Sequence, residues 1–155
     1  MKFTKMQGAG NDYVYLNCFE ETLPEPPEIL AGKLADRHFG IGSDGLVLIT
    51  PSDVADFRMR MFNPDGSESE MDGNAIRCIA KYAYEHGICE NNPMAVETGA
   101  GIMTLHCELL AGEVKRVRVD MGQPILKPSR IPTRLRMGED RENDPVIELP
   151  LTVGH

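Results

Sequence analysis

The segment Phe62–Cys78, FNPDGSESEMDGNAIRC, decides how this chain is expected to fold. It begins with NPDGS, which predicts a tight turn because proline and glycine stand at turn positions. The residues after Asp72 are mostly small or apolar and predict a helix over Asn74–His86, with Gly87 suited to its C-terminal end. A turn, an acidic stretch and the start of a helix therefore follow one another closely.

The charged residues of the predicted helix fall on a single stripe. Arg77, Lys81 and Glu85 are spaced four residues apart, so they lie along one side of the helix. The remaining positions are largely apolar or small. A helix that is polar on one stripe only is surrounded by protein on its other sides. We therefore expect this helix to be central, with strands packed around it.

Strands are expected both before and after this helix. The alternation of apolar residues and arginines in DFRMRMF is typical of a half-buried strand. A further helix is expected over Pro26–His38, where two prolines suit the first turn. The expected strands are Phe3–Met6, Tyr13–Phe19, Leu46–Thr50, Asp56–Phe62, Met94–Glu97, Ile102–Leu109 and Val114–Met121.

The chain changes character beyond residue 121. The stretch GQPILKPSRIPT contains three prolines and predicts a linker, and the final apolar run PVIELPLTVGH predicts a strand without a partner. We therefore expect a first domain over residues 1–121, followed over residues 122–155 by a linker and the beginning of an incomplete second domain.

Charge, apolar segments and cysteine spacing indicate the binding partners and the cellular compartment to expect. The formal net charge of −8 argues against nucleic acids and anionic membranes, because both require a basic surface. No stretch has the apolar length of a signal peptide or a membrane span, so a cytoplasmic protein is expected. The cysteines have no Cys-x-x-Cys spacing and are expected to be reduced thiols; they are Cys18, Cys78, Cys89 and Cys107.

Two further motifs are interpreted without a ligand. GIGSDG, Gly40–Gly45, matches G-x-G-x-x-G, but it follows a helix and precedes a strand, which reverses the order of a dinucleotide site. We interpret it as a tight turn. The acidic run Glu68–Gly73 resembles the front of a calcium loop, but the position of the closing glutamate is Ile79, on the predicted buried helix. No metal site is expected.

Asp72 stands immediately before the predicted helix. Its carboxylate can accept hydrogen bonds from the N–H groups of the first turn, so it is first of all a good N-cap. Gly73 and Asn74 would then present free backbone N–H groups, and such a helix start binds carboxylates and phosphates. The residues alone leave open whether Asp72 is only a cap, a catalytic base or a replacement for another residue.

Taken together, MQGAGNDYV, RHFGIGSDGL, FNPDGSESEMDGNAIRC and ETGAG resemble the N-terminal half of the diaminopimelate epimerases, over nearly the whole chain. The resemblance implies an α+β fold in which a curled mixed or antiparallel sheet wraps around the central helix Asn74–His86. Members of this family are isomerases that interconvert LL- and meso-diaminopimelate for lysine and peptidoglycan synthesis. The resemblance implies an amino-acid substrate and neither pyridoxal phosphate nor a metal as cofactor.

The same resemblance implies roles for five positions. Epimerisation needs one group that removes the α-proton and another that delivers a proton to the opposite face. In the family both groups are cysteines at helix N-termini, where a thiolate is stabilised, and Asp72 stands at the position of the first. Asn11 and Asn63 correspond to substrate-contacting asparagines. Gly73 and Asn74 correspond to the helix start that binds the α-carboxylate.

Two departures from the family pattern leave alternatives open. Asp72 stands where the family has its first catalytic cysteine. The second domain, which carries the other cysteine, is expected to be missing from this chain. A homodimer is also considered. A carboxylate is a much weaker base than a thiolate, although burial would strengthen it. We expect an altered epimerase half that is inactive alone, an isomerase using Asp72 as a carboxylate base, or a non-catalytic carboxylate-binding module.

Overall fold

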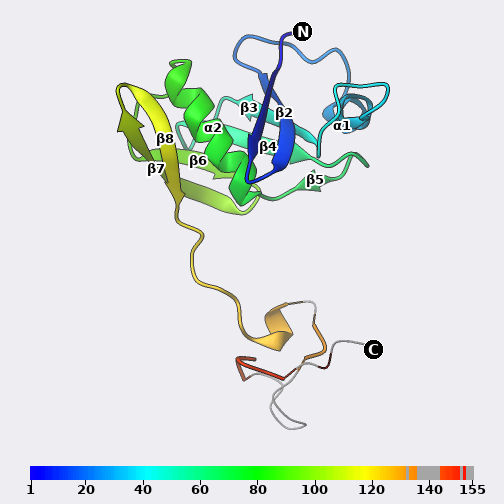
Figure 1. Cartoon of the computed structure of the whole chain (residues 1–155), viewed down its shortest axis with the longest axis vertical. Coiled ribbons are helices and arrows are strands. Elements are labelled where there is room, and N and C mark those ends of the chain that lie inside the picture. Colours follow the sequence, from blue (N-terminus) through cyan, green and yellow to red (C-terminus); the bar gives the residue numbers. More distant parts are fainter. Residues whose placement is uncertain (132, 136–143, 151, 153–155) are drawn as a thin grey trace. The chain divides into compact units, whose positions relative to one another are not determined.

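The computed structural model describes residues 1–131, 133–135, 144–150 and 152. Residues 1–121 form one compact unit and residues 122–155 another. The first unit holds two α-helices and a set of strands (Figure 1). Its elements are β1 (Thr4–Gly8), β2 (Asn11–Asn17), α1 (Pro27–Ala35), β3 (Leu46–Thr50), β4 (Phe57–Phe62), β5 (Glu68–Ser69), α2 (Gly73–Glu85), β6 (Met94–Thr98), β7 (Gly101–Leu110) and β8 (Glu113–Val119).

The strands form one mixed sheet in the order β1-β2-β3-β4-β6-β7-β8, with the short β5 paired to β4. The pairs β2–β3 and β4–β6 are parallel, and the others are antiparallel. The sheet curls around α2, which packs against β1, β2, β7 and β8 (Figure 1). This arrangement confirms the expected α+β class, the curled mixed sheet and the central helix. The helix itself begins and ends one residue earlier than predicted.

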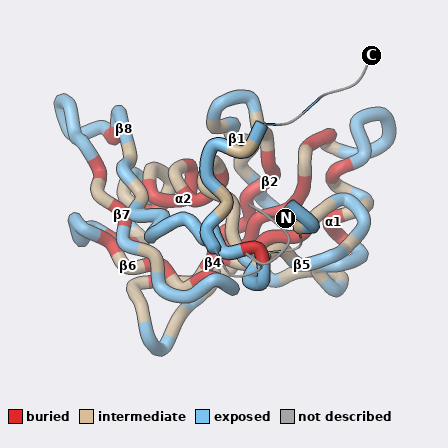
Figure 2. Tube along the Cα trace, turned by 90° about the horizontal axis from the view of Figure 1, so that it is seen from below, coloured by how far each residue is buried: buried red, intermediate tan, exposed pale blue. Residues whose placement is uncertain are grey.

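Strand β2 shows how both faces of the sheet are covered. Tyr13 and Tyr15 belong to the core cluster that includes α2, whereas Val14 and Leu16 belong to a second cluster with Leu30 of α1. A strand buried on both faces carries a continuous apolar run in place of a polar alternation. Buried residues are accordingly concentrated on α2 and the central strands (Figure 2).

The hairpin between β1 and β2 is tighter than the sequence predicted. Only Ala9 and Gly10 separate the two strands, and both have positive φ angles, 54° and 88°. This is the conformation of a two-residue turn that matches the twist of a hairpin. Asn11 is therefore the first residue of β2, paired with Gly8, and does not lie in a loop.

Helix α1 ends at Ala35, three residues before the predicted end. The next residue, Asp36, turns its carboxylate back onto the chain and accepts hydrogen bonds from the N–H groups of His38 (2.7 Å) and Phe39 (2.8 Å). Aspartate side chains offer the backbone this alternative to a further helical turn. The chain therefore turns directly after α1 and continues into Gly40–Gly45.

The second unit contains one short element among its described residues, the 3-10 helix η1 (Pro128–Arg130). The N–H of Val146 donates to the carbonyl of Leu126 (3.0 Å). Residues 145–150 form no strand, so the predicted terminal strand is wrong for them, and positions 151 and 153–155 lie outside the described residues. A strand needs a neighbour for its backbone groups, which an apolar sequence alone does not supply.

The described residues contain neither a membrane-spanning helix nor a cluster of metal ligands. None of their helices is both long enough and apolar enough to cross a bilayer. No group of three or more His, Cys, Asp or Glu side chains among them is arranged to hold a metal ion.

Candidate active site

The carboxylate of Asp72 caps α2. Its Oδ1 atom accepts hydrogen bonds from the backbone N–H groups of Asn74 (2.8 Å) and Ala75 (2.7 Å). The positive end of the helix dipole also favours a negative charge here. Within the part of the chain that the structure describes, no donor bonds the second oxygen, Oδ2. Asp72 therefore serves as a cap with one oxygen and keeps the other available.

The start of α2 is less open to a ligand than the sequence predicted. The prediction required free N–H groups on both Gly73 and Asn74, but the Asn74 N–H donates to Asp72. Of these two N–H groups, only that of Gly73 lacks an acceptor among the described residues. Asp72 thus places its own carboxylate where the substrate carboxylate was expected. Substrate binding by Gly73 and Asn74 stays a prediction.

Arg77 holds the first turn of α2 from the side. Its guanidinium donates to the carbonyl of Gly73 (Nη1, 2.7 Å) and to Oδ1 of Asn74 (Nη2, 2.5 Å). The Asn74 side chain is therefore fixed as an acceptor toward Arg77. The sequence pattern places Arg77 on the polar stripe of the helix and predicted no role for its positive charge at the candidate site.

Asn11 is bound to a loop that lies far from it in the sequence. Its Nδ2 atom donates to Oδ2 of Asp44 (2.8 Å), and the same oxygen accepts the N–H of Asp12 (3.0 Å). The N–H of Asp44 donates in return to the carbonyl of Asp12 (2.7 Å). Asp44 belongs to GIGSDG, so the segment interpreted as a simple turn clamps the start of β2.

Arg37 joins the two aspartates of this clamp. It forms two hydrogen bonds with the carboxylate of Asp12 (2.7 and 3.2 Å) and one with Oδ1 of Asp44 (2.9 Å). Lys5 adds an ion pair with Asp12 (3.1 Å). The hydrogen bonds from Arg37, and next those from Lys5, hold the pKa of Asp12 well below its ordinary value. The carboxylate of Asp12 therefore remains charged at neutral pH.

The pKa of the buried Tyr13 side chain responds to both Asp72 and Asn11. Burial raises the pKa of Tyr13, the negative charge of Asp72 raises it further, and a hydrogen bond with the Asn11 side chain acts in the opposite direction. In addition, a Cβ atom on Gly8 would lie 3.0 Å from the carbonyl oxygen of Asn74, so the end of β1 touches the first turn of α2. The structure therefore brings Asn11 close to the start of α2.

Asn63 takes part in the turn after β4. Its N–H donates to the carbonyl of Ser67 (2.9 Å), and its Nδ2 donates to the Ser67 hydroxyl oxygen (2.9 Å). That hydroxyl donates in turn to Asp65 (2.6 Å). Among the described residues, Asn63 forms no hydrogen bond with the other four predicted site residues. Its predicted role in substrate binding is not tested by these contacts.

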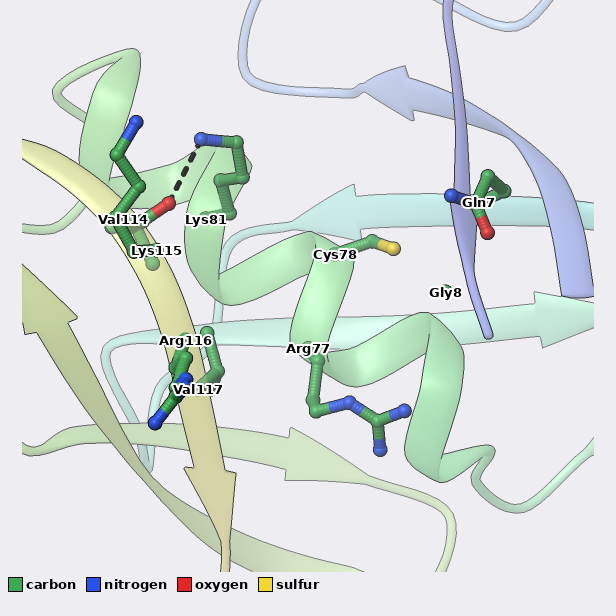
Figure 3. Close-up of a pocket in the computed structure, with 9 residues that line it drawn as sticks. All are labelled: Gln7, Gly8, Arg77, Cys78, Lys81, Val114, Lys115, Arg116 and Val117. Carbon is green, nitrogen blue, oxygen red and sulfur yellow. Dashed lines mark hydrogen bonds between the residues drawn. The ribbon is translucent and has the colours of Figure 1, made fainter. Parts of the chain in front are cut away.

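A cavity of about 400 Å³ lies on the flank of α2, between β1 and β8 (Figure 3). None of Asn11, Asn63 or Asp72 lines it. Lys81 spans its upper edge by donating to the carbonyl of Val114 (3.0 Å). Its lining residues are Gln7, Gly8, Arg77, Cys78, Lys81, Val114, Lys115, Arg116 and Val117. The cavity therefore borders the candidate site, but the predicted catalytic and substrate-binding side chains do not line it.

The cysteines do not replace the missing thiol. All four are free, as expected, and three of them are buried. Burial raises the pKa of the thiols of Cys18, Cys89 and Cys107, which favours the unreactive protonated form. Cys78 lies within α2, six positions after Asp72, and points toward the side of β1 (Figure 3). The N-terminus of α2 thus carries a carboxylate and no thiol.

Comparison with known sequences gives a consistent result. A sequence model of the family described as diaminopimelate epimerase matches residues 3–127. The chain is 62% identical over 132 residues to a diaminopimelate epimerase of Acetivibrio thermocellus, covering 85% of this chain and 47% of that protein. It is 54% identical over 156 residues to a diaminopimelate epimerase of Agathobacter rectalis, covering 100% of this chain and 54% of that protein. The chain spans about half the length of the curated relatives it matches.

Comparison with solved structures supports the fold alone. A probable proline racemase from Agrobacterium radiobacter K84 superimposes with a TM-score of 0.59 and 18% sequence identity. The match covers 76% of this chain and 40% of that one. A curled sheet around a helix is therefore an architecture that other proteins share.

Proposed function

This chain belongs to the diaminopimelate epimerase family, and from that premise we propose that it is the first half of an enzyme that interconverts LL- and meso-diaminopimelate. Such an enzyme would be an isomerase of lysine and peptidoglycan synthesis in the cytoplasm, acting without pyridoxal phosphate. The two relatives described above are diaminopimelate epimerases that are 62% and 54% identical to this chain. The substrate is then a small amino acid with a carboxylate and an ammonium group on the reacting carbon.

The observation that carries the proposal is the position of Asp72 at the start of α2. Here a charged side chain, the Gly73 N–H and the helix dipole converge on one point. Inversion at a carbon atom needs one proton-transfer group on each face. This chain offers one face at the N-terminus of its central helix, and its length relative to the family leaves the other face to a second half.

With Asp72 in place of the thiol, we propose that the chain is inactive alone. The Oδ1 atom is engaged by the N–H groups of Asn74 and Ala75, so this oxygen is not available to accept a proton from a substrate. The negative charge of Asp72 also opposes the approach of a substrate carboxylate to the helix start. Both effects act against removal of an α-proton.

A second candidate function is favoured by the other oxygen of Asp72. Because Oδ2 has no donor among the described residues, it could accept a proton from a more acidic substrate than an amino acid. The chain would then be part of an isomerase with a carboxylate base. The third alternative, a carboxylate-binding module, has less support because Asp72 already occupies the Asn74 N–H.

One comparison separates these functions. This chain is followed by the second half of the Agathobacter rectalis relative and prepared in two forms, with Asp72 and with Asp72→Cys. Each is incubated with diaminopimelate in deuterated water, and α-proton exchange is followed by mass spectrometry and chiral analysis. The cysteine form should exchange at least about a hundredfold faster, the scale of a positioned acid or base.

The matched control is Asp65→Cys, which places a thiol on the exposed turn after β4 and should not promote exchange. Equal exchange by the Asp72 and Asp72→Cys forms would favour the carboxylate base. Absence of exchange in both would remove the epimerase proposal.

A further inference from the structure

A second cavity of about 400 Å³ lies at the C-terminal end of α2, beside β1 and β2. Helix α2 has 13 residues, so this end is about 20 Å away from its start at Asp72. None of the five predicted site residues lines the cavity. It is therefore separate from the candidate active site.

Asn17 brings an unused hydrogen-bond donor to this cavity. The residue is only 8% exposed and lies on the same face of β2 as Tyr15. Its Oδ1 accepts the N–H of Phe19 (3.1 Å), and since only the oxygen of an amide can accept, the orientation of the amide is fixed. No acceptor among the described residues bonds Nδ2. Arg58 Nε is the single fully enclosed side-chain nitrogen or oxygen without a partner in the described part of the chain, so Asn17 Nδ2 is open to the cavity.

Aromatic rings form much of the wall above Asn17. Tyr82 and His86 stack on one another, with ring centroids 3.9 Å apart and an angle of 18° between their planes. Tyr15 is buried in the wall, and Phe3 is exposed at the rim. Aromatic side chains make offset-stacked and edge contacts with other flat rings. The wall therefore suits a flat ring better than an aliphatic group.

The charges at the rim are of both signs. Lys2 is positive, Glu20 and Glu21 are negative, and Glu21 also lies 3.9 Å from the N-terminal ammonium group of Met1. Neither sign predominates, and a charged group that enters an apolar cavity without a partner is costly. The cavity therefore favours a neutral ligand.

We propose that this cavity binds a neutral, flat aromatic ring that carries a carbonyl oxygen. The carbonyl oxygen accepts from Nδ2 of Asn17, and the ring lies against Tyr82 and His86. Small-molecule sites are usually cavities of about 300 to 1,000 Å³ with apolar walls and a few polar groups that fix the ligand. The proposal goes beyond the proposed epimerase function and does not depend on it.

The first test compares two ligands on the unsubstituted 155-residue chain, benzamide and cyclohexanecarboxamide, which has the same amide without the flat ring. Benzamide at up to about 10 mM, a range that detects millimolar affinity, should shift the NMR signals of the Asn17 side-chain amide and of the Tyr82 and His86 backbone amides. Cyclohexanecarboxamide should bind about fivefold more weakly, the scale of an aromatic contact. Absence of shifts with benzamide, or equal affinity for the two ligands, would overturn the proposal.

The second test removes the donor of Asn17. Asn17→Asp keeps an oxygen for the N–H of Phe19 and replaces the free N–H groups by an acceptor, so benzamide should bind at least about tenfold more weakly. Gln7→Glu is the matched control, because its Oε1 likewise accepts a backbone N–H, that of Gly10 (2.9 Å), and Gln7 does not line this cavity. Unchanged affinity in Asn17→Asp would contradict the proposed hydrogen bond.

The third test removes a ring and leaves the turn at Asn17 intact. Tyr82→Leu keeps an apolar side chain, and it should abolish the preference for benzamide over cyclohexanecarboxamide. Phe39→Leu is its control, because Phe39 is 95% exposed and lies outside the cavity. A preference that survives in Tyr82→Leu would show that the ring of Tyr82 does not contact the ligand. The proposed epimerase function is decided separately by α-proton exchange, so the two failures are distinguishable.

Discussion

The Oδ1 atom of Asp72 lies 2.7 Å from the backbone nitrogen of Ala75, which makes the aspartate a cap of the central helix. The same oxygen also receives the N–H of Asn74. The residue predicted to stand at the position of the family's catalytic cysteine thereby stabilises the first turn of the helix. Helix capping and the proposed proton transfer therefore depend on the same carboxylate, and substitutions at position 72 can separate the two roles.

Asp72→Ala should lower the free energy of unfolding by about 1 kcal/mol, because two N–H groups lose their acceptor. Asp72→Asn should retain most of the stability, since asparagine caps helices about as well as aspartate. Urea denaturation of the three forms measures the difference. Asp53→Ala is the control, because Asp53 is exposed and forms no hydrogen bond with other described residues. A loss in Asp53→Ala equal to that in Asp72→Ala would contradict the capping role.

Removing the resident carboxylate should open the helix start to anions. In Asp72→Gly the N–H groups of Asn74 and Ala75 are released and join that of Gly73, so sulfate should bind about tenfold more tightly than to the unsubstituted chain. Amide NMR shifts at Gly73 and Asn74 during a sulfate titration measure this. Shifts of equal size in the two forms would show that Asp72 does not block the site.

Acid should weaken the fold through the clamp of Asp12 and Arg37. The folded-state pKa of Asp12 is depressed, chiefly by Arg37, so its stabilisation is fully present above the unfolded value of about 3.9 and is lost as the pH falls toward the folded value. Urea midpoints measured from pH 7 to pH 3 should therefore fall below about pH 5. Arg37→Gln should reduce the pH dependence of the free energy of unfolding. The reduction should be smaller than the effect of binding one whole proton, because Arg37 is 54% exposed and solvent screens the ion pair.

Arg116→Gln is the matched control for this prediction. Arg116 is an exposed arginine of β8 and has no ion pair among the described residues. Its replacement removes the same charge and should leave the pH dependence unchanged. An unchanged pH dependence in Arg37→Gln as well would mean that the clamp does not couple proton binding to folding.

The helix α2 and most strands could be predicted because their signals are local. Apolar spacing in DFRMRMF and one polar stripe after Asp72 are sufficient to recognise a half-buried strand and a central helix. The clamp could not be predicted in this way. Asn11 and Asp44 are 33 positions apart, and their contact depends on the pairing of β2 with β3, which no local pattern specifies.

The sequence predicted the cap at the start of α2 but not which N–H groups of the first turn are free. The N-cap role of Asp72 follows from residue type and the helix boundary. An N-cap side chain accepts from the N–H groups two or three positions later, so the occupation of the Asn74 N–H follows from the capping role itself, and the prediction of a free N–H there overlooked this. Arg37 and Asp44 were missed because each acts through a contact with a distant part of the chain. Arg77 was missed although its partners, Gly73 and Asn74, lie four and three positions earlier in its own helix. RHFGIGSDGL was part of the family resemblance, and that was the only signal for the first two.

Gly45→Ala should destabilise the first unit by about 1 to 3 kcal/mol, the usual effect of overpacking. A Cβ atom there would lie 2.3 Å from the carbonyl oxygen of Phe62 and 3.1 Å from the ring of Tyr13. Thermal denaturation measures the effect. Gly73→Ala is the control, because its Cβ would meet only ordinary contacts at 3.7 Å or more. Equal stability of the two variants would show that the loop carrying Asp44 is not packed against β4.

The purified 155-residue chain should not invert diaminopimelate. Inversion requires a proton donor on the face opposite the base, and the described residues offer one helix N-terminus of this kind, at Asp72. Burial raises the pKa of the thiols of Cys18, Cys89 and Cys107, so these cysteines do not supply a thiolate. Incubation in deuterated water, followed by mass spectrometry and chiral analysis, should find neither deuterium at the α-carbon nor a change of configuration. Deuterium incorporation without inversion would identify Asp72 as a working base on one face, and full inversion would show that one chain, or two copies of it, completes the site.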